Sequence, residues 1–185
     1  LIGILQEHEG DERPRVGAIG SKTKWSSFKK AAMEEGILEE RLDNVRCPIG
    51  IDIGAPVGTA CMAFADGQIS HFGYNAADGD YGHVVITKHI LDGISIWALY
   101  GHLDSASIEG KSVGQKVNAG DVICWMGAPH ENGGWEPHLH FQLSFQEPKT
   151  HDMPGVVAPN DREEALRIYP DPRLVLGPLY EIVDR

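Results

Sequence analysis

The sequence has few basic residues. Its 185 residues include 16 lysines and arginines against 27 aspartates and glutamates, for a formal net charge of −11, and no stretch is rich in lysine or arginine. Nucleic acids and anionic membrane surfaces are bound through such basic stretches. The composition therefore argues against both partners, and it is compatible with a cationic or zwitterionic peptide.

Long apolar runs and cysteines are also scarce. No apolar run approaches the roughly 18 residues of a membrane-spanning helix, so we expect no membrane span. The three cysteines, Cys47, Cys61 and Cys124, form no C-x-x-C pair, and an odd number is a poor basis for a disulfide framework. The cysteines favour a reducing compartment, although the sequence names no cellular location. A chain of this length can bury its own core as one domain with extensions.

Three segments of different composition divide the chain. Residues 1–44 are interpreted as an N-terminal arm with a short helix over 24–35, where apolar side chains recur near helical spacing and a glycine follows. Residues 45–146 form the main domain. Residues 147–185 are rich in proline and contain one charged stretch at 160–167 that predicts a short capped helix. We expect this last segment to pack on the main domain.

The main domain has the pattern of an all-β fold, because short β-rich runs alternate with glycine, Asp-Gly and asparagine turns. The predicted strands cover 50–53, 60–65, 68–73, 83–89, 94–100, 116–118, 122–126 and 140–144. The dipeptide Asp66-Gly67 stands between two of these runs. It predicts a tight hairpin there.

Histidines and one aspartate are the candidate chemical groups. His138 and His140 are spaced i and i+2 ahead of a β-rich run, so they share one face of a strand, and imidazole is the commonest metal ligand. Asp52 alternates with two isoleucines, which is also the pattern of a solvent-facing strand acid. His102 follows a strand-like run and could equally be a packed core residue. Taken together, an acid, a strand-end histidine and a His-x-His pair favour a metal-centred site.

Seven short motifs carry a resemblance to a known family. They are, in chain order, Gly-Ile-Asp-Ile at 50–53, Ala-Pro-Val-Gly-Thr at 55–59, Asp-Gly-Gln-Ile at 66–69, Tyr-Gly-His-Val-Val-Ile at 81–86, Tyr-Gly-His-Leu at 100–103, Gly-Gln-Lys-Val-Asn-Ala-Gly at 114–120 and Pro-His-Leu-His-Phe at 137–141. Over about residues 45–145 the series resembles the lysostaphin-type (LytM-like) zinc metallopeptidases. The resemblance implies a twisted antiparallel β-sheet that cradles a groove. It also implies hydrolysis of the peptides of bacterial cell walls.

The resemblance assigns roles to four residues. Asp52 and His140 match two of the family's zinc ligands, and His102 and His138 match the pair that serves the metal-bound water and the developing oxyanion. Zinc with three protein ligands and one open position lowers the pKa of its bound water to near neutral. A neutral imidazole beside it can orient that water or stabilise a tetrahedral intermediate.

One position departs from the family pattern. The first zinc ligand of the family is a histidine four residues before the aspartate, where this chain has Pro48, and proline has no side-chain donor for a metal. Cys47 is the local substitute, although a shift of one residue turns a strand side chain to the opposite face. Other histidines that could complete the site are His71, His83 and His89, the last being more simply a structural partner. His8, His130 and His151 lie in loop or tail sequence, where we expect them to be solvated.

Two classes of function therefore remain open. The first is a zinc endopeptidase whose metal is completed by a residue outside the matched motifs. The second is a catalytically inactive relative that binds peptides or regulates other proteins, and a purely architectural domain is a third alternative. With Pro48 in the ligand position, we expect zinc to be absent or weakly bound.

Overall fold

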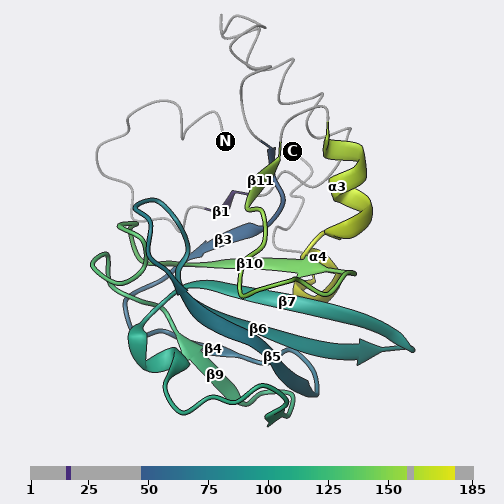
Figure 1. Ribbon diagram of the computed structural model, residues 1–185, viewed down its shortest axis with the longest axis horizontal. Coiled ribbons are helices and arrows are strands. Elements are labelled where there is room, and N and C mark those ends of the chain that lie inside the picture. Colours follow the sequence, from purple (N-terminus) through teal and green to yellow (C-terminus); the bar gives the residue numbers. More distant parts are fainter. Residues whose placement is uncertain (1–15, 18–46, 158–160, 178–185) are drawn as a thin grey trace, which may run out of the picture.

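The computed structural model of the protein describes residues 16–17, 47–157 and 161–177 (Figure 1). For 16–17 and 47–48 it describes the backbone alone. The helix predicted over 24–35 lies outside the described residues. No helix in the described ranges is long and apolar enough to cross a lipid bilayer.

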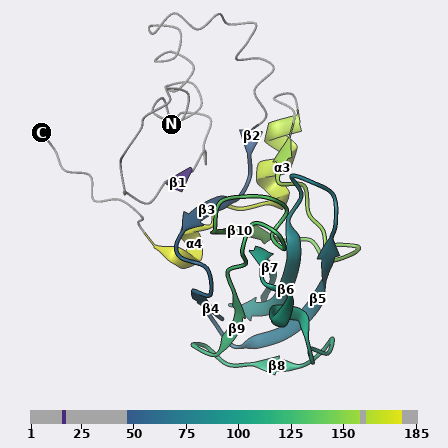
Figure 2. The same ribbon diagram turned by 90° about the vertical axis from the view of Figure 1, so that its left-hand side faces the viewer.

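A seven-stranded antiparallel sheet forms the body of the domain. Its order is β1 (Val16–Gly17), β3 (Ile51–Gly54), β10 (His138–Ser144), β7 (Ile94–Leu103), β6 (Gly82–Leu91), β5 (Gly67–Asn75) and β8 (Lys116–Val117). The sheet twists strongly from β3 to β8, as the turned view shows (Figure 2). The predicted all-β class, with a twisted antiparallel core, is confirmed.

Two small sheets and three short helical segments complete the described structure. One sheet pairs β2 (Cys47–Pro48) with β11 (Val156–Val157), and the other pairs β4 (Ala60–Met62) with β9 (Val122–Trp125). The helical segments are a 3₁₀ turn, η2 (Ser105–Ile108), and the helices α3 (Arg162–Ile168) and α4 (Arg173–Leu176). Every predicted strand run overlaps an observed strand, and α3 confirms the helix predicted at 160–167. Asp161 at its start makes no side-chain capping bond.

The hairpin predicted at Asp66-Gly67 is wrong. Strand β4 pairs with β9, and β5, which begins at Gly67, pairs with β6 and β8 instead. Asp66 makes hydrogen bonds to two distant segments. Its carboxylate accepts the Ala119 N–H at 2.8 Å, and its carbonyl accepts from His89 Nδ1 at 3.1 Å. These long-range bonds hold the chain in an open bend before β5. A two-residue turn would instead have paired β5 with the strand that precedes it.

The main core lies on one face of the large sheet, against the β4–β9 pair. On β10, the alternate residues Leu139, Phe141 and Leu143 belong to this core, and Phe141 and Leu143 are almost completely buried. Burial of side chains of this size contributes about 1.5–3 kcal/mol each. Because strand side chains alternate, His138, His140 and Gln142 project from the other face. The packing of β10 therefore determines which way its histidines point.

A second, smaller core covers that other face. It contains Val84 and Ile86 from β6, Trp97 and Leu99 from β7, and Tyr81, Met153 and Tyr169 from the segments around them. The C-terminal segment contributes to both cores, because Val175 and Leu176 pack against the main one. The backbone N–H of Phe145 also donates to the Ile168 carbonyl at 2.8 Å. The histidines of β10 lie on the same face as this second core.

Candidate functional site

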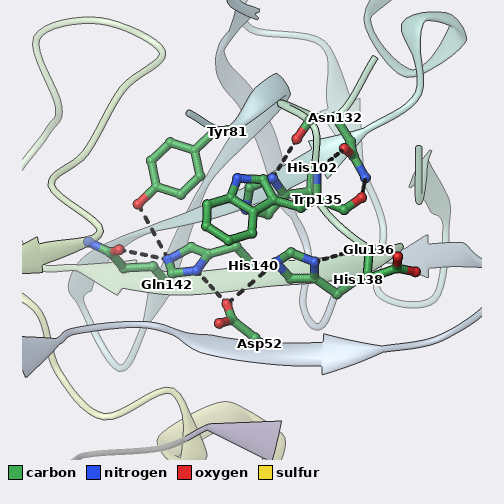
Figure 3. A network of polar contacts seen from close by, with 9 residues as sticks. All are labelled: Asp52, Tyr81, His102, Asn132, Trp135, Glu136, His138, His140 and Gln142. Atoms are coloured by element: carbon green, nitrogen blue, oxygen red, sulfur yellow. Dashed lines mark hydrogen bonds and ion pairs between the residues drawn. The ribbon is translucent and has the colours of Figure 1, made fainter. Parts of the chain in front are cut away.

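The register of β10 between β3 and β7 brings the predicted site residues together (Figure 3). His140 lies directly opposite Asp52 on β3 and opposite Gly101 on β7. His138 pairs with Gly54, two residues further along, so its side chain is the diagonal neighbour of Asp52 on the same face. Asp52, His138 and His140 therefore meet as the strand pattern predicts.

Asp52 and His140 contact each other directly. His140 Nδ1 lies 2.7 Å from Asp52 Oδ1, and His138 Nε2 lies 3.9 Å from the same oxygen. Burial raises the pKa of Asp52, but the hydrogen bond from His140 and the three nearby imidazoles outweigh it and leave the pKa below its ordinary value. The carboxylate is therefore ionised at neutral pH and is held by the histidines around it.

The other ring nitrogen of His140 faces Gln142. Gln142 Nε2 donates to the Pro154 carbonyl at 3.1 Å, which turns its Oε1 toward His140 Nε2, also at 3.1 Å. The hydroxyl of Tyr81 approaches the same nitrogen at 3.4 Å. Burial and the surrounding carboxylates raise the pKa of Tyr81, so it stays a neutral phenol. Both ring nitrogens of His140 thus face oxygen atoms of neighbouring side chains.

Tyr81 and Gln142 were missed by the sequence reasoning. A Cβ on Gly101 would come within 2.9 Å of the Tyr81 ring, and one on Gly155 would meet the Tyr81 hydroxyl. Because these glycines have no side chains, there is room for Tyr81 next to His140. For Gln142 a usable signal existed, because it follows His140 by two residues and therefore shares its strand face.

A β-bulge places His102. His83 pairs with Leu103 and Val85 with Tyr100, so β7 carries one residue more than β6 between these pairs. His102 lies in this bulge with a φ of 64°, a backbone conformation that is uncommon for a residue other than glycine. Its N–H donates to the Tyr81 carbonyl at 2.8 Å and its carbonyl accepts the Gly127 N–H at 2.9 Å. The backbone around His102 is therefore fixed from both sides.

His102 and His138 are oriented in the same manner. His102 Nδ1 lies 2.7 Å from the Asn132 carbonyl, and His138 Nδ1 lies 2.6 Å from the Glu136 carbonyl. A carbonyl only accepts, so each Nδ1 carries the hydrogen and each Nε2 faces away from that carbonyl. The two rings lie 4.2 Å apart between centroids. They form a pair of the kind that the resemblance predicts for His102 and His138.

The buried position of His102 keeps it neutral. Burial lowers its pKa to about 4, with His138 and His140 adding to the effect and the hydrogen bond to Asn132 opposing it. At neutral pH, Nε2 of His102 therefore carries a lone pair that can accept a hydrogen bond or a proton.

Position 48 is described only by its backbone pairing. Pro48 in β2 pairs with Val156 of β11, in a sheet separate from the one that carries Asp52. The side chains of Cys47 and Pro48 lie outside the described part of the structure, so the substitution of Cys47 for a lost ligand remains a prediction. Gly50 lies between Pro48 and Asp52, and a Cβ there would collide with the His140 ring.

The other histidines considered as ligands have partners elsewhere. His71 Nδ1 contacts Ser70 Oγ at 2.9 Å, and His83 Nδ1 contacts the Glu131 carbonyl at 3.0 Å. His89 is buried and bonded to Thr87, which agrees with a structural role. His130 is exposed as expected. His151 is half-buried, and its ring packs against Gly73, so it is less exposed than the sequence predicts. His8 lies outside the described residues.

These donors do not fit a zinc ion as placed. Two zinc ligands in tetrahedral geometry lie about 3.4 Å apart, whereas His140 Nδ1 and Asp52 Oδ1 are at the hydrogen-bonding distance of 2.7 Å. Within the described ranges, no three histidine, cysteine, aspartate or glutamate side chains are grouped so that they could hold a metal. Asp52 and His140 supply two donors, and the third would have to come from another residue.

Comparison with known families agrees with the fold. The model of peptidase family M23 matches residues 48–152, which is more than half of the chain. The chain therefore belongs to peptidase family M23, a family that is typically zinc-dependent. A second model, the XdhC Rossmann domain, matches residues 3–61, but β3 within that range pairs only antiparallel to its neighbours in the described structure.

The curated relatives include both hydrolases and activators of hydrolases. The chain is 32% identical over 128 residues, 69% of its length, to the cell division protein DipM of Caulobacter vibrioides. It is 37% identical over 98 residues to the DD-carboxypeptidase/endopeptidase Mpg of Neisseria meningitidis, and 36% identical over 97 residues to the murein hydrolase activator NlpD of Escherichia coli, each 52% of its length. The matches span 17%, 20% and 23% of these relatives.

Solved structures of the family are also similar to the chain. The catalytic domain of lysostaphin from Staphylococcus simulans is 25% identical, with a TM-score of 0.43, over 63% of this chain and 78% of that one. A catalytic-domain mutant of EnpA from Enterococcus faecalis is 28% identical, with a TM-score of 0.43, over 60% of this chain and 75% of that one.

Proposed function

We propose that this M23 domain binds cell-wall-type peptides without hydrolysing them and acts as a binding or regulatory module. The observation that carries the proposal is the direct hydrogen bond between Asp52 and His140, in a chain that has Pro48 where the resemblance places the family's first ligand. Two donors leave half of a tetrahedral zinc site to water. A full set of protein ligands gives about 10–16 kcal/mol of apparent zinc binding, and we expect the loss of one of three to remove several of these.

The relatives support a role of this kind. NlpD is named a murein hydrolase activator and DipM a cell division protein, so similarity to this family is compatible with functions other than hydrolysis. Peptide binding requires groups that can contact a main chain, and the described site has them. His102 presents an uncharged Nε2 that can accept a peptide N–H, and the indole of Trp135 lies beside it with ring centroids 6.2 Å apart.

A zinc endopeptidase is the second candidate, and one observation favours it. His102 and His138 keep a paired arrangement in which backbone carbonyls fix each ring, as catalysis on a metal-bound water would require. Such an enzyme would complete its zinc with a ligand from outside the described donors, of which Cys47 is the nearest in sequence. In that case Asp52 and His140 would separate from each other to bind the metal.

Binding and cleavage should be measured on the same samples. A synthetic cell-wall stem peptide and pentaglycine would be titrated into the purified protein by calorimetry, with and without added zinc, and each mixture would then be analysed by mass spectrometry. We expect saturable binding of the stem peptide and no cleavage products. His102→Asn should weaken the binding, because it removes the imidazole acceptor. Asparagine is chosen because it tolerates the left-handed backbone conformation of this position.

Detection of cleavage products that disappear in His102→Asn would contradict the proposal and establish the endopeptidase. Absence of any binding by the native protein would contradict both functions and favour an architectural domain. Asn118→Ala is a suitable control, because Asn118 bonds to Asp121 in an exposed turn and takes no part in the site.

A further inference from the structure

The loop that precedes β10 is organised around one buried asparagine. Asn132 is completely buried, and its side chain makes three hydrogen bonds. Its Oδ1 accepts the Trp135 N–H at 2.9 Å, and its Nδ2 donates to the carbonyls of Trp135 at 2.9 Å and Gly127 at 3.2 Å. A donor facing Oδ1 and two acceptors facing Nδ2 leave only one orientation for the amide. The side chain therefore fixes the main chain of Trp135 at both its N–H and its carbonyl.

The main chain of the same residue fixes His102. The Asn132 carbonyl accepts the hydrogen of His102 Nδ1 at 2.7 Å, and its N–H donates to the Ala128 carbonyl at 3.1 Å. One residue thus holds the main chain of Trp135 through its side chain and the imidazole of His102 through its backbone. The close-up view shows both rings next to Asn132 (Figure 3).

The loop is also fastened to the segment that leads into β6. The Gly79 N–H donates to the Gly133 carbonyl at 2.9 Å. A Cβ on Gly82 would come within 2.6 Å of the Asn132 backbone, and one on Gly133 would collide with the Asp80 carbonyl. Such close approaches between main chains are open only to glycine. Asn132 is therefore held between two segments, and the rings that it positions are held with it.

Trp135 is nonetheless exposed. Its side chain is 47% accessible, and its ring centroid lies 6.2 Å from that of His102 and 6.4 Å from that of His138. A large apolar ring whose main chain is fixed in advance loses little conformational entropy when it contacts a ligand. The indole offers an apolar surface, and His102 Nε2 beside it offers a hydrogen-bond acceptor.

We infer that Asn132 is a positioning residue that holds His102 and the main chain of Trp135 as one preformed surface for a peptide main chain. This inference rests on the proposed peptide-binding function. The peptide donates a main-chain N–H to His102 Nε2 and places the adjacent Cα or methyl group against the Trp135 indole.

The substitution Asn132→Asp tests the inference with almost no change in shape. A carboxylate oxygen would face the carbonyls of Gly127 and Trp135 in place of the Nδ2 donor, so two bonds are lost. We expect stem-peptide affinity to fall about tenfold. We also expect the His102 Nδ1–H signal to lose its protection from solvent exchange in nitrogen-15 NMR. Quenching of Trp135 fluorescence by acrylamide, isolated by subtracting a Trp135→Phe variant, should increase.

Controls separate positioning from general instability. Asn118→Asp makes the same chemical change in an exposed turn and should leave all three readouts unchanged. Asn132→Ser, which leaves room for a water molecule, provides a second variant if the aspartate does not fold, and it should move the readouts in the same direction.

The outcomes are distinguishable. If folded Asn132→Asp or Asn132→Ser keeps the native His102 ring signal, Trp135 quenching and peptide affinity, the inference is overturned. A native protein without a protected His102 Nδ1–H overturns it without any variant. If the native protein binds no peptide, the proposed function fails and the ligand contact of Trp135 fails with it. In that case the ring signal and the quenching still decide whether Asn132 positions the two residues.

Discussion

The two sides of the site are held together in different ways. On the β7 side, His102 and His138 are each oriented by a backbone carbonyl of the loop that precedes β10. On the β3 side, Asp52 and His140 are oriented by each other. The first arrangement needs no metal to persist, whereas the second occupies the donor atoms that a metal would use. The comparison teaches that the orientation of His102 and His138 depends on the loop before β10, whereas the orientation of Asp52 and His140 depends on their contact with each other.

The largest expected effect comes from restoring the missing donor. Pro48→His should raise zinc affinity by about 100-fold or more, because a third ligand contributes several of the roughly 10–16 kcal/mol of a complete site. Titration calorimetry with zinc measures the gain. Pro48→Ala is the control, since it removes the proline ring without adding a donor, and it should leave zinc affinity unchanged. No gain in a folded Pro48→His protein would show that Asp52 and His140 are not zinc ligands.

Two glycine substitutions compare the rigidity of the two sides. Gly82→Ala should lower the free energy of unfolding by about 2–4 kcal/mol, because the methyl group would meet the Asn132 backbone and Gly82 has φ 61°. Gly50→Ala should cost about 1–3 kcal/mol, because its closest contact is the His140 side chain, which is displaced more easily than a main chain. Urea unfolding measures both values. A larger cost for Gly50→Ala would mean that the Asp52 side is the more rigid one.

Much of the fold was predictable because it depends on local pattern. Alternation in β10 and the motif order placed Asp52, His102, His138 and His140 in one site. The pairing of β4 with β9 was not predictable, because Asp66-Gly67 has the local signal of a hairpin and the bonds that overrule it come from His89 and Ala119. Tyr81 begins the motif at 81–86, but neither that motif nor the sequence around Asn132 indicates what the two side chains contact. Their roles depend on glycines far away in the sequence, whose missing side chains only the folded structure reveals.

The acid sensitivity of the β7 side gives a further test. His102 has a pKa of about 4 in the folded protein against an ordinary value of 6.5, so the unfolded chain binds more protons between these values. Stability should therefore fall as the pH drops from 6.5 to 4, by about 3 kcal/mol from this group. Urea unfolding across that range measures the slope. His102→Asn should have a shallower slope, and an equal slope would mean that His102 is not kept neutral by burial.

The smallest expected effect concerns the contact between Tyr81 and His140. Tyr81→Phe removes a hydroxyl that lies 3.4 Å from His140 Nε2, at the long end of hydrogen bonding. The free energy of unfolding should fall by about 0.5 kcal/mol, because the hydrogen bond between His140 and Asp52 still holds the ring. A loss above about 2 kcal/mol would show that the hydroxyl, and not Gln142, is the main partner of that nitrogen.

The zinc content of the native protein tests the central claim most directly. Elemental analysis would be made on protein purified at neutral pH without added metal, beside Cys47→Ala prepared in the same way. With two protein donors at the site, the ratio of zinc to protein should be far below one and equal in the two samples. A tight one-to-one ratio that is lost in Cys47→Ala would contradict the account and show that a thiolate completes a working zinc site.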